Sequence, residues 1–90
     1  MRIDRFLVFI RILKSRTQAQ GLIDEGRVRI DGRRVEKPSD QVAVGSVIAF
    51  PLHERVRILR VLGMPVRRGP APEARACYEE LGIDGDGPPQ

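Results

Sequence analysis

Apolar residues recur at helical spacing in the first thirteen positions of the chain. At 100° per residue, one side of a helix over residues 2–13 carries Ile3, Phe6, Leu7, Phe9, Ile10 and Leu13. Ser15 followed by Gln18 fits a capping box, which predicts that a second helix starts at Ser15. Gly26 is placed to end that helix. The start of the chain therefore predicts two amphipathic helices in succession.

The pattern changes to alternation after Gly26. Residues 27–30 read Arg-Val-Arg-Ile, which puts two arginines on one face of a strand and two β-branched residues on the other. Asp31-Gly32 is a two-residue hairpin signal, and residues 33–36 return as the partner strand. An apolar run at 47–50 predicts a further short strand, and so does the alternation over 55–58, which merges into a more continuous apolar run ending at Leu62. We expect an α+β fold in which two N-terminal helices pack on a small, mostly antiparallel sheet.

The remainder of the chain differs in composition. Residues 63–72 are rich in Pro and Gly, which predicts a connector without regular structure. A stripe at helical spacing then predicts a short C-terminal helix over residues 73–82; its members are Ala74, Cys77, Tyr78 and Leu81. Residues 83–90 predict a disordered tail. The predicted organisation is one domain over residues 1–62, followed by the connector, the helix and the tail.

Charge is distributed unevenly along these segments. The 90 residues carry 16 Lys and Arg against 12 Asp and Glu, a net charge of +4. Residues 1–68 hold 15 of the cations and 7 of the anions, a balance of +8, and residues 69–90 hold the rest, a balance of −4. A small body with such an excess of cations is typical of a protein that binds a polyanion, either nucleic acid or an anionic lipid surface.

Residues that could carry catalysis are sparse. The chain has one His and one Cys, with no metal-ligand spacing and no phosphate-binding glycine loop. We interpret His53 as a solvated loop residue and Cys77 as a packed apolar residue. A chain of this length also excludes a multidomain enzyme. We therefore expect no catalytic activity, no cofactor and no metal. With no predicted signal peptide, membrane span or disulfide, we expect a cytoplasmic protein.

The basic residues are better organised than the acidic ones. Lys14, Ser15 and Arg16 stand at the start of the second helix, where free backbone N–H groups and the helix dipole favour a phosphate. Gln20 extends the same helix face by one turn. In the hairpin, Arg27 and Arg29 project from one face, and Arg33 is expected to be within reach across the turn. The remaining cations of this set are Lys37, just after the hairpin, and Arg2 and Arg5 in the first helix.

Several segments resemble the αL motif of the S-four RNA-binding domain family. In chain order they are Met1-Arg-Ile-Asp-Arg-Phe-Leu7, Lys14-Ser-Arg-Thr-Gln-Ala19, Ile23-Asp-Glu-Gly-Arg-Val28, Ile30-Asp-Gly32, Lys37-Pro-Ser39 and Val42-Ala-Val-Gly-Ser-Val47. They cover roughly residues 1–52 in the expected order. The segment Arg67-Arg-Gly-Pro-Ala-Pro-Glu73, before Tyr78-Glu-Glu-Leu81, is similar to the stand-alone bacterial heat-shock protein fifteen group.

This resemblance implies binding of structured ribosomal RNA on the large ribosomal subunit, in quality control or rescue of stalled subunits that hold peptidyl-tRNA. It implies RNA contacts by Arg2, Asp4, Lys14, Ser15, Arg16, Gln20, Gly26, Val28, Asp31 and Gly32. Buried members are expected to set the shape of the surface. Asp4 is expected to orient a neighbouring arginine, because a carboxylate repels phosphate. The group usually has a tryptophan in the first helix, where this chain has Phe6 and Val8, and its common Asn-Gly turn is Asp31-Gly32 here.

Other functions also fit the basic composition. One is an adaptor for anionic surfaces, either a membrane or an acidic protein. Another is an accessory RNA-binding subunit of an RNA-modifying enzyme. Phosphate contacts alone do not distinguish DNA from RNA. The favoured interpretation is a monomeric RNA-binding protein without a membrane partner.

Overall fold

The structure is a computed structural model that describes residues 1–83. Its first helix, α1, runs only from Ile3 to Phe9, so it is shorter than the predicted 2–13. The helix stops because Arg11 adopts a left-handed conformation with φ of 65°. The N–H groups of Ile12 and Leu13 then both donate to the Leu7 carbonyl. Leu13 is nevertheless buried, so the apolar spacing predicted burial correctly beyond the end of the helix.

The second helix, α2, spans Arg16–Asp24 and begins as predicted. Ser15 Oγ accepts a hydrogen bond from the Gln18 N–H at 3.1 Å, and Gln18 Oε1 accepts one from the Lys14 N–H at 3.0 Å. The two side chains thus satisfy donors at the helix start reciprocally, in the manner of a capping box. At the other end, Gly26 has φ of +73° and provides the left-handed turn that ends the helix.

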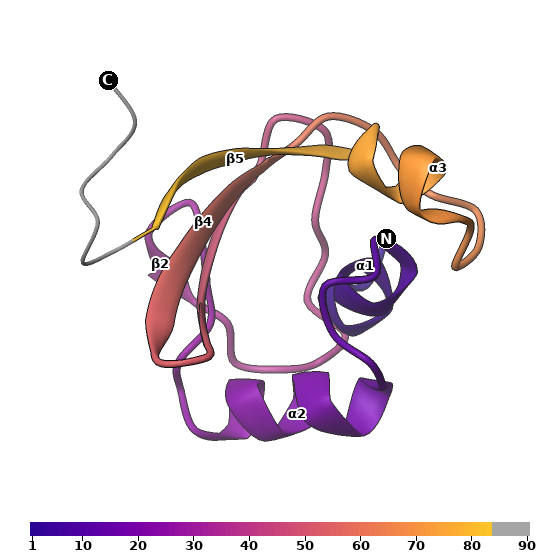
Figure 1. The fold of residues 1–90 in the computed structure, drawn as a ribbon. Helices are drawn as coiled ribbons and strands as arrows, with labels where there is room; N and C mark the ends of the chain where they lie inside the picture. Colours follow the sequence, from indigo (N-terminus) through magenta and orange to yellow (C-terminus); the bar gives the residue numbers. More distant parts are fainter. Residues whose placement is uncertain (84–90) are drawn as a thin grey trace.

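Five strands within residues 1–83 form one antiparallel sheet. They are β1 (Arg29–Ile30), β2 (Arg33–Arg34), β3 (Val47–Leu52), β4 (Arg55–Val61) and β5 (Tyr78–Ile83), in the spatial order β2-β1-β3-β4-β5. The predicted Asp31-Gly32 hairpin is confirmed, with both turn residues at positive φ. The sheet curls around α1, and α2 lies across its open side (Figure 1). The expected α+β fold is therefore confirmed.

One core fills the space between the helices and the sheet. Its largest fully buried side chains include Phe6 and Leu7 from α1 and Phe50 and Leu59 from the sheet. The two helices contribute their predicted apolar sides, while the sheet contributes alternate residues of β3 and β4. Because helices and sheet share this core, the cations on their outer surfaces are carried by rigid elements.

The prediction of a helix over residues 73–82 is wrong. A helix, α3, covers only Ala71–Arg75, and the chain from Tyr78 to Ile83 forms β5. The stripe at helical spacing was misleading because β4 has a free edge that β5 pairs with, and tertiary pairing overrides local propensity. The tail predicted for 83–90 overlaps β5 at Ile83, and the other residues, 84–90, lie outside the described residues.

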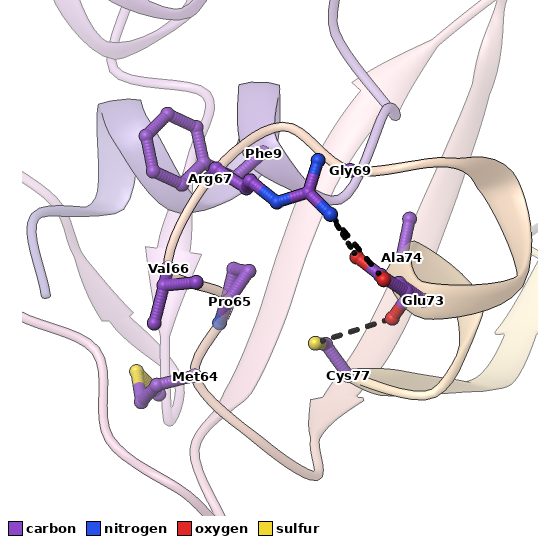
Figure 2. Close-up of a pocket in the computed structure, with 9 residues that line it drawn as sticks. All are labelled: Phe9, Met64, Pro65, Val66, Arg67, Gly69, Glu73, Ala74 and Cys77. Atoms are coloured by element: carbon purple, nitrogen blue, oxygen red, sulfur yellow. Dashed lines mark hydrogen bonds and ion pairs between the residues drawn. The ribbon is translucent and has the colours of Figure 1, made fainter.

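The connector that precedes α3 has no helix or strand over residues 63–70, close to the predicted 63–72. Arg11, just after α1, holds it to the body by donating to the Gly69 carbonyl at 3.1 Å, and Arg67 of the connector forms an ion pair with Glu73 of α3 at 3.3 Å. Figure 2 shows the small hollow of about 210 Å³ that the connector forms against Phe9 and Cys77. The connector is thus an ordered loop that carries the chain to α3.

Candidate nucleic-acid interface

A buried carboxylate joins the starts of α1 and α2. Asp4 is 0 % exposed, and its oxygens accept hydrogen bonds from Arg2 at 3.0 and 3.1 Å and from Arg16 at 3.3 Å. The Arg5 backbone N–H donates to the same carboxylate at 2.8 Å. These donors offset the cost of burying a charge. Asp4 therefore holds two arginines whose side chains remain 35 % and 47 % exposed.

Lys14 and Arg16 flank the cap residue Ser15 at the start of α2, and both are exposed. Ser15 is occupied as the helix cap, so it shapes this end of the helix. Within residues 1–83, Lys14 has no carboxylate at ion-pair distance. Gln20, one turn further along α2, is half-buried. The helix start thus presents two cations together with the backbone N–H groups of its first turn.

The start of α1 also lies against the turn that follows the hairpin. The N–H groups of Ile3 and Asp4 donate to the carbonyls of Asp40 and Pro38 at 2.8 and 3.3 Å, and Arg2 pairs with Gln41 in an isolated bridge. This turn forms one wall of a hollow of about 450 Å³ whose other wall is the hairpin. Three cations line the hollow: Arg33, Arg34 and Lys37. The turn that borders this hollow is therefore the same turn that contacts the start of α1.

We give the name basic surface to the surface formed by the starts of α1 and α2 together with this hollow. Its cations are Arg2, Lys14, Arg16, Arg33, Arg34 and Lys37. In the described part of the chain, no carboxylate lies within ion-pair distance of Lys14, Arg33, Arg34 or Lys37. A surface that gathers unpaired cations on rigid elements is suited to a phosphate backbone.

The strand register corrects one expectation about the hairpin. Arg29 lies opposite Arg34, whereas Arg33 lies opposite Ile30. Because residues directly opposite each other share a face of the sheet, Arg34 rather than Arg33 stands beside Arg29. The sequence reasoning missed Arg34, although a two-residue turn at Asp31-Gly32 already requires this register. Arg33 remains exposed and lines the hollow instead.

The other predicted residues of this region have internal partners or structural positions. Asp31 Oδ1 accepts from the Val47 N–H at 2.9 Å, so its charge helps to join the hairpin to β3. Val28 is fully buried. Arg27 forms an exposed ion pair with Glu25 at 3.4 Å, and Arg29 donates to the Gly32 carbonyl at 3.5 Å. Arg5 is exposed.

The arginines of β4 are in a different situation. Arg57 forms an ion pair with Glu80, and Arg60 forms one with Glu79 at 2.8 Å. The hydrogen bond to Glu80 raises the pKa of Arg57, against the opposing effect of its partial burial. Two glutamates of β5 therefore neutralise two arginines of β4, Arg57 and Arg60.

The lone histidine and cysteine lie outside the basic surface. His53 is exposed in the turn between β3 and β4. Burial, with the nearby Glu73 carboxylate, raises the pKa of the Cys77 thiol. Residues 1–83 contain no group of three or more His, Cys, Asp and Glu side chains that could hold a metal ion. Nor does any helix in this part of the chain have the length and apolar character that crossing a membrane requires.

Comparison with known proteins agrees with this architecture. The S4 domain family model matches residues 1–48. The chain is 35 % identical over 80 residues to a heat shock protein 15 homolog from Aeromonas salmonicida, covering 89 % of this chain and 60 % of that protein. It is 35 % identical over 83 residues to the small ribosomal subunit protein uS4 of Limosilactobacillus fermentum, covering 92 % of this chain and 39 % of that protein.

A solved structure shows the same fold. The trimeric structure of heat shock protein 15 from Vibrio cholerae matches with a TM-score of 0.82 and 30 % identity, over 89 % of this chain and 80 % of that one. The matched S4 segment, residues 1–48, contains α1, α2 and the hairpin, and hence all six cations of the basic surface. The chain therefore belongs to the S4 domain family and is an RNA-binding protein similar to heat shock protein 15.

Proposed function

We propose that this protein is a non-catalytic factor that binds structured ribosomal RNA on the large ribosomal subunit, in the rescue of stalled subunits that hold peptidyl-tRNA. The observation that supports it most is the basic surface itself. Lys14, Arg33, Arg34 and Lys37 have no carboxylate partner in residues 1–83, and Asp4 holds two further arginines in place. Cations that are already oriented lose little side-chain entropy when they meet a phosphate.

The placement of the aromatic residues favours folded RNA over single strands. Proteins that capture unpaired bases stack them on exposed aromatic side chains. Here Phe6 and Phe50 are 0 % exposed, and Phe9 and Tyr78 are partly buried. Arginine and lysine on rigid elements instead suit the phosphate ridges and the shape of a folded RNA.

The large subunit is favoured over the small one by similarity to heat shock protein 15. The chain spans 60 % of the curated heat shock protein 15 homolog but only 39 % of the uS4 protein. The resemblance of the connector to the heat-shock group points the same way. A small-subunit site remains the second candidate, because a uS4 protein is 35 % identical to this chain.

A sucrose gradient of cell lysate, probed for this protein at moderate salt, tests the proposal. We expect co-migration with free large subunits, increased when translation is stalled. Co-migration with small subunits would support the second candidate. A protein found only at the top of the gradient, with equal affinity for single-stranded homopolymers and ribosomal RNA, would overturn the proposal.

The electrostatic basis of binding has its own test. If about five phosphates are neutralised, the logarithm of the binding constant should fall against the logarithm of salt concentration with a slope near −3.5 to −4.5. Fluorescence anisotropy with labelled ribosomal RNA fragments measures that slope. A slope near zero would contradict the role of the basic surface.

One feature separates this proposal from an adaptor for anionic membranes. The apolar side of α1 is buried in the core, so it is not available to insert into a bilayer. We expect no flotation with anionic liposomes.

We also propose that the protein acts as a monomer, although the Vibrio cholerae relative was solved as a trimer. Light scattering of the purified protein decides between the two states.

A further inference from the structure

Gly26 ends α2 and also lies close to the side chain of Arg34. Its φ of +73° ends α2, which glycine does best and asparagine also tolerates. A Cβ atom at this position would also lie 2.8 Å from Cζ and Nη2 of Arg34 and 2.9 Å from its Nε. Since three atoms of the planar guanidinium are almost equally close, the group lies broadside over the glycine. A Cβ atom at residue 26 would therefore displace the guanidinium, which is the far end of a flexible side chain, from this position.

The guanidinium of Arg34 has no other partner in the described part of the chain. No carboxylate lies at ion-pair distance and no acceptor takes a hydrogen bond from it. The residue is exposed, so its N–H donors face solvent. Within residues 1–83, the guanidinium thus lies against Gly26 while its N–H donors have no acceptor.

The surroundings of Arg34 are basic. Arg29 lies directly opposite on β1, and Arg33 and Lys37 line the same hollow. Two acidic residues also line that hollow: the Asp40 carboxylate accepts from the backbone N–H groups of Glu36 and Lys37, and Glu36 forms no ion pair within residues 1–83. Cations gathered in this way repel one another, and an anionic ligand relieves that repulsion.

We propose that Arg34 contacts a phosphate of the bound RNA, and that Gly26 is the positioning residue that leaves room for its guanidinium. This inference rests on the proposed RNA-binding function and deepens it. A planar guanidinium can donate two parallel hydrogen bonds to one phosphate. Holding it against Gly26 reduces the rotamer freedom that binding would otherwise remove.

Binding of fragments of total ribosomal RNA, measured by fluorescence anisotropy over a salt series, tests the contact. Arg34→Gln should weaken binding about fivefold at 0.15 M salt and reduce the salt slope by about 0.7–0.9, the value for one phosphate. Arg68→Gln is the matched control, because Arg68 is also exposed and unpaired in the described residues but lies in the connector. It should change neither value.

The positioning role needs a variant that adds a Cβ atom at positive φ with as little backbone strain as possible. Gly26→Asn is that variant, since asparagine tolerates positive φ better than most other residues do. It should weaken binding about as much as Arg34→Gln, and the double variant should bind no worse than either single variant. Gly45→Ala is the control for strain, because Gly45 has φ of +96° and open space around its Cα. It should lower stability and leave RNA affinity unchanged.

Each outcome decides a separate point. Binding that survives Arg34→Gln with an unchanged slope overturns the contact while the proposed function stands. Additive losses in the double variant overturn the positioning role of Gly26. Failure of the wild-type protein to bind the fragments overturns the proposed function and this inference with it. If Gly26→Asn does not fold, the NMR order parameter of the Arg34 Nε–Hε bond in the wild type tests the positioning role instead. An order parameter no higher than that of Arg68 overturns the positioning role.

Discussion

The basic surface and the β4–β5 strand pair both carry basic residues, yet their charges are balanced in opposite ways. On β4, Arg57 and Arg60 each form an ion pair with a glutamate of β5. On the basic surface, Lys14, Arg33, Arg34 and Lys37 have no carboxylate partner within residues 1–83. The cationic surplus of residues 1–68 is therefore concentrated on α1, α2 and the hairpin. At the opposite edge of the sheet, the glutamates of β5 neutralise Arg57 and Arg60.

The ion pairs of Asp4 contribute to the basic surface, because they hold Arg2 and Arg16 in place. Its carboxylate is fully buried, whereas the Glu79 side chain is 45 % exposed. We predict that Asp4→Asn lowers the free energy of unfolding by about 2–3 kcal/mol, because Arg2, Arg16 and the Arg5 N–H lose a charged acceptor. Glu79→Gln should cost less than about 1 kcal/mol. Urea denaturation measures both, and equal costs would contradict the distinction between the two kinds of pair.

The contrast between the two regions predicts a large difference in RNA affinity. A triple Gln variant of Lys14, Arg33 and Lys37 should bind ribosomal RNA on the order of 50-fold more weakly at 0.15 M salt, since each lost phosphate contact removes about 0.7–0.9 from the salt slope. The matched control replaces Arg57, Arg60 and Arg67, which all have glutamate partners. It makes the same change in net charge and should weaken binding less than threefold. Similar losses would mean that net charge alone drives binding.

A single charge reversal probes the same contrast at the start of α2. Arg16→Glu should weaken RNA binding at least about tenfold, because it removes one contact and opposes the incoming phosphate. Arg75→Glu, in α3, makes the same change in charge outside the basic surface and should have little effect. Anisotropy with the same RNA measures both variants, and circular dichroism confirms that they fold. Equal losses would place the RNA elsewhere on the protein.

Much of the basic surface could be predicted from the sequence because local rules determine it. The capping box at Ser15, the turn at Asp31-Gly32 and the alternation of residues 27–30 each depend on neighbours in the chain. Arg34 was within reach of the same reasoning, since the turn length dictates which residues face each other. What the sequence did not reveal was the close approach of the Arg34 guanidinium to Gly26.

The β4–β5 region could not be predicted in the same way. Tyr78 and its neighbours carry a helical stripe, and only the free edge of β4 makes a strand the better solution. The pairing of Glu79 with Arg60 joins residues 19 positions apart, and no local pattern signals it. For this reason the sequence predicted the excess of positive charge correctly but not its cancellation along β4.

The smallest predicted effect tests that cancellation directly. Glu79→Gln frees Arg60, whose side chain is already 48 % exposed, and should raise the affinity for ribosomal RNA about threefold at low salt. Because the freed arginine lies outside the basic surface, the gain should be independent of RNA structure and should vanish at high salt. Adding Arg60→Gln to Glu79→Gln restores the original net charge and should abolish the gain. If the gain persisted in the double variant, removal of the acidic charge itself would be its cause, and the ion pairs along β4 would have no part in confining RNA to the basic surface.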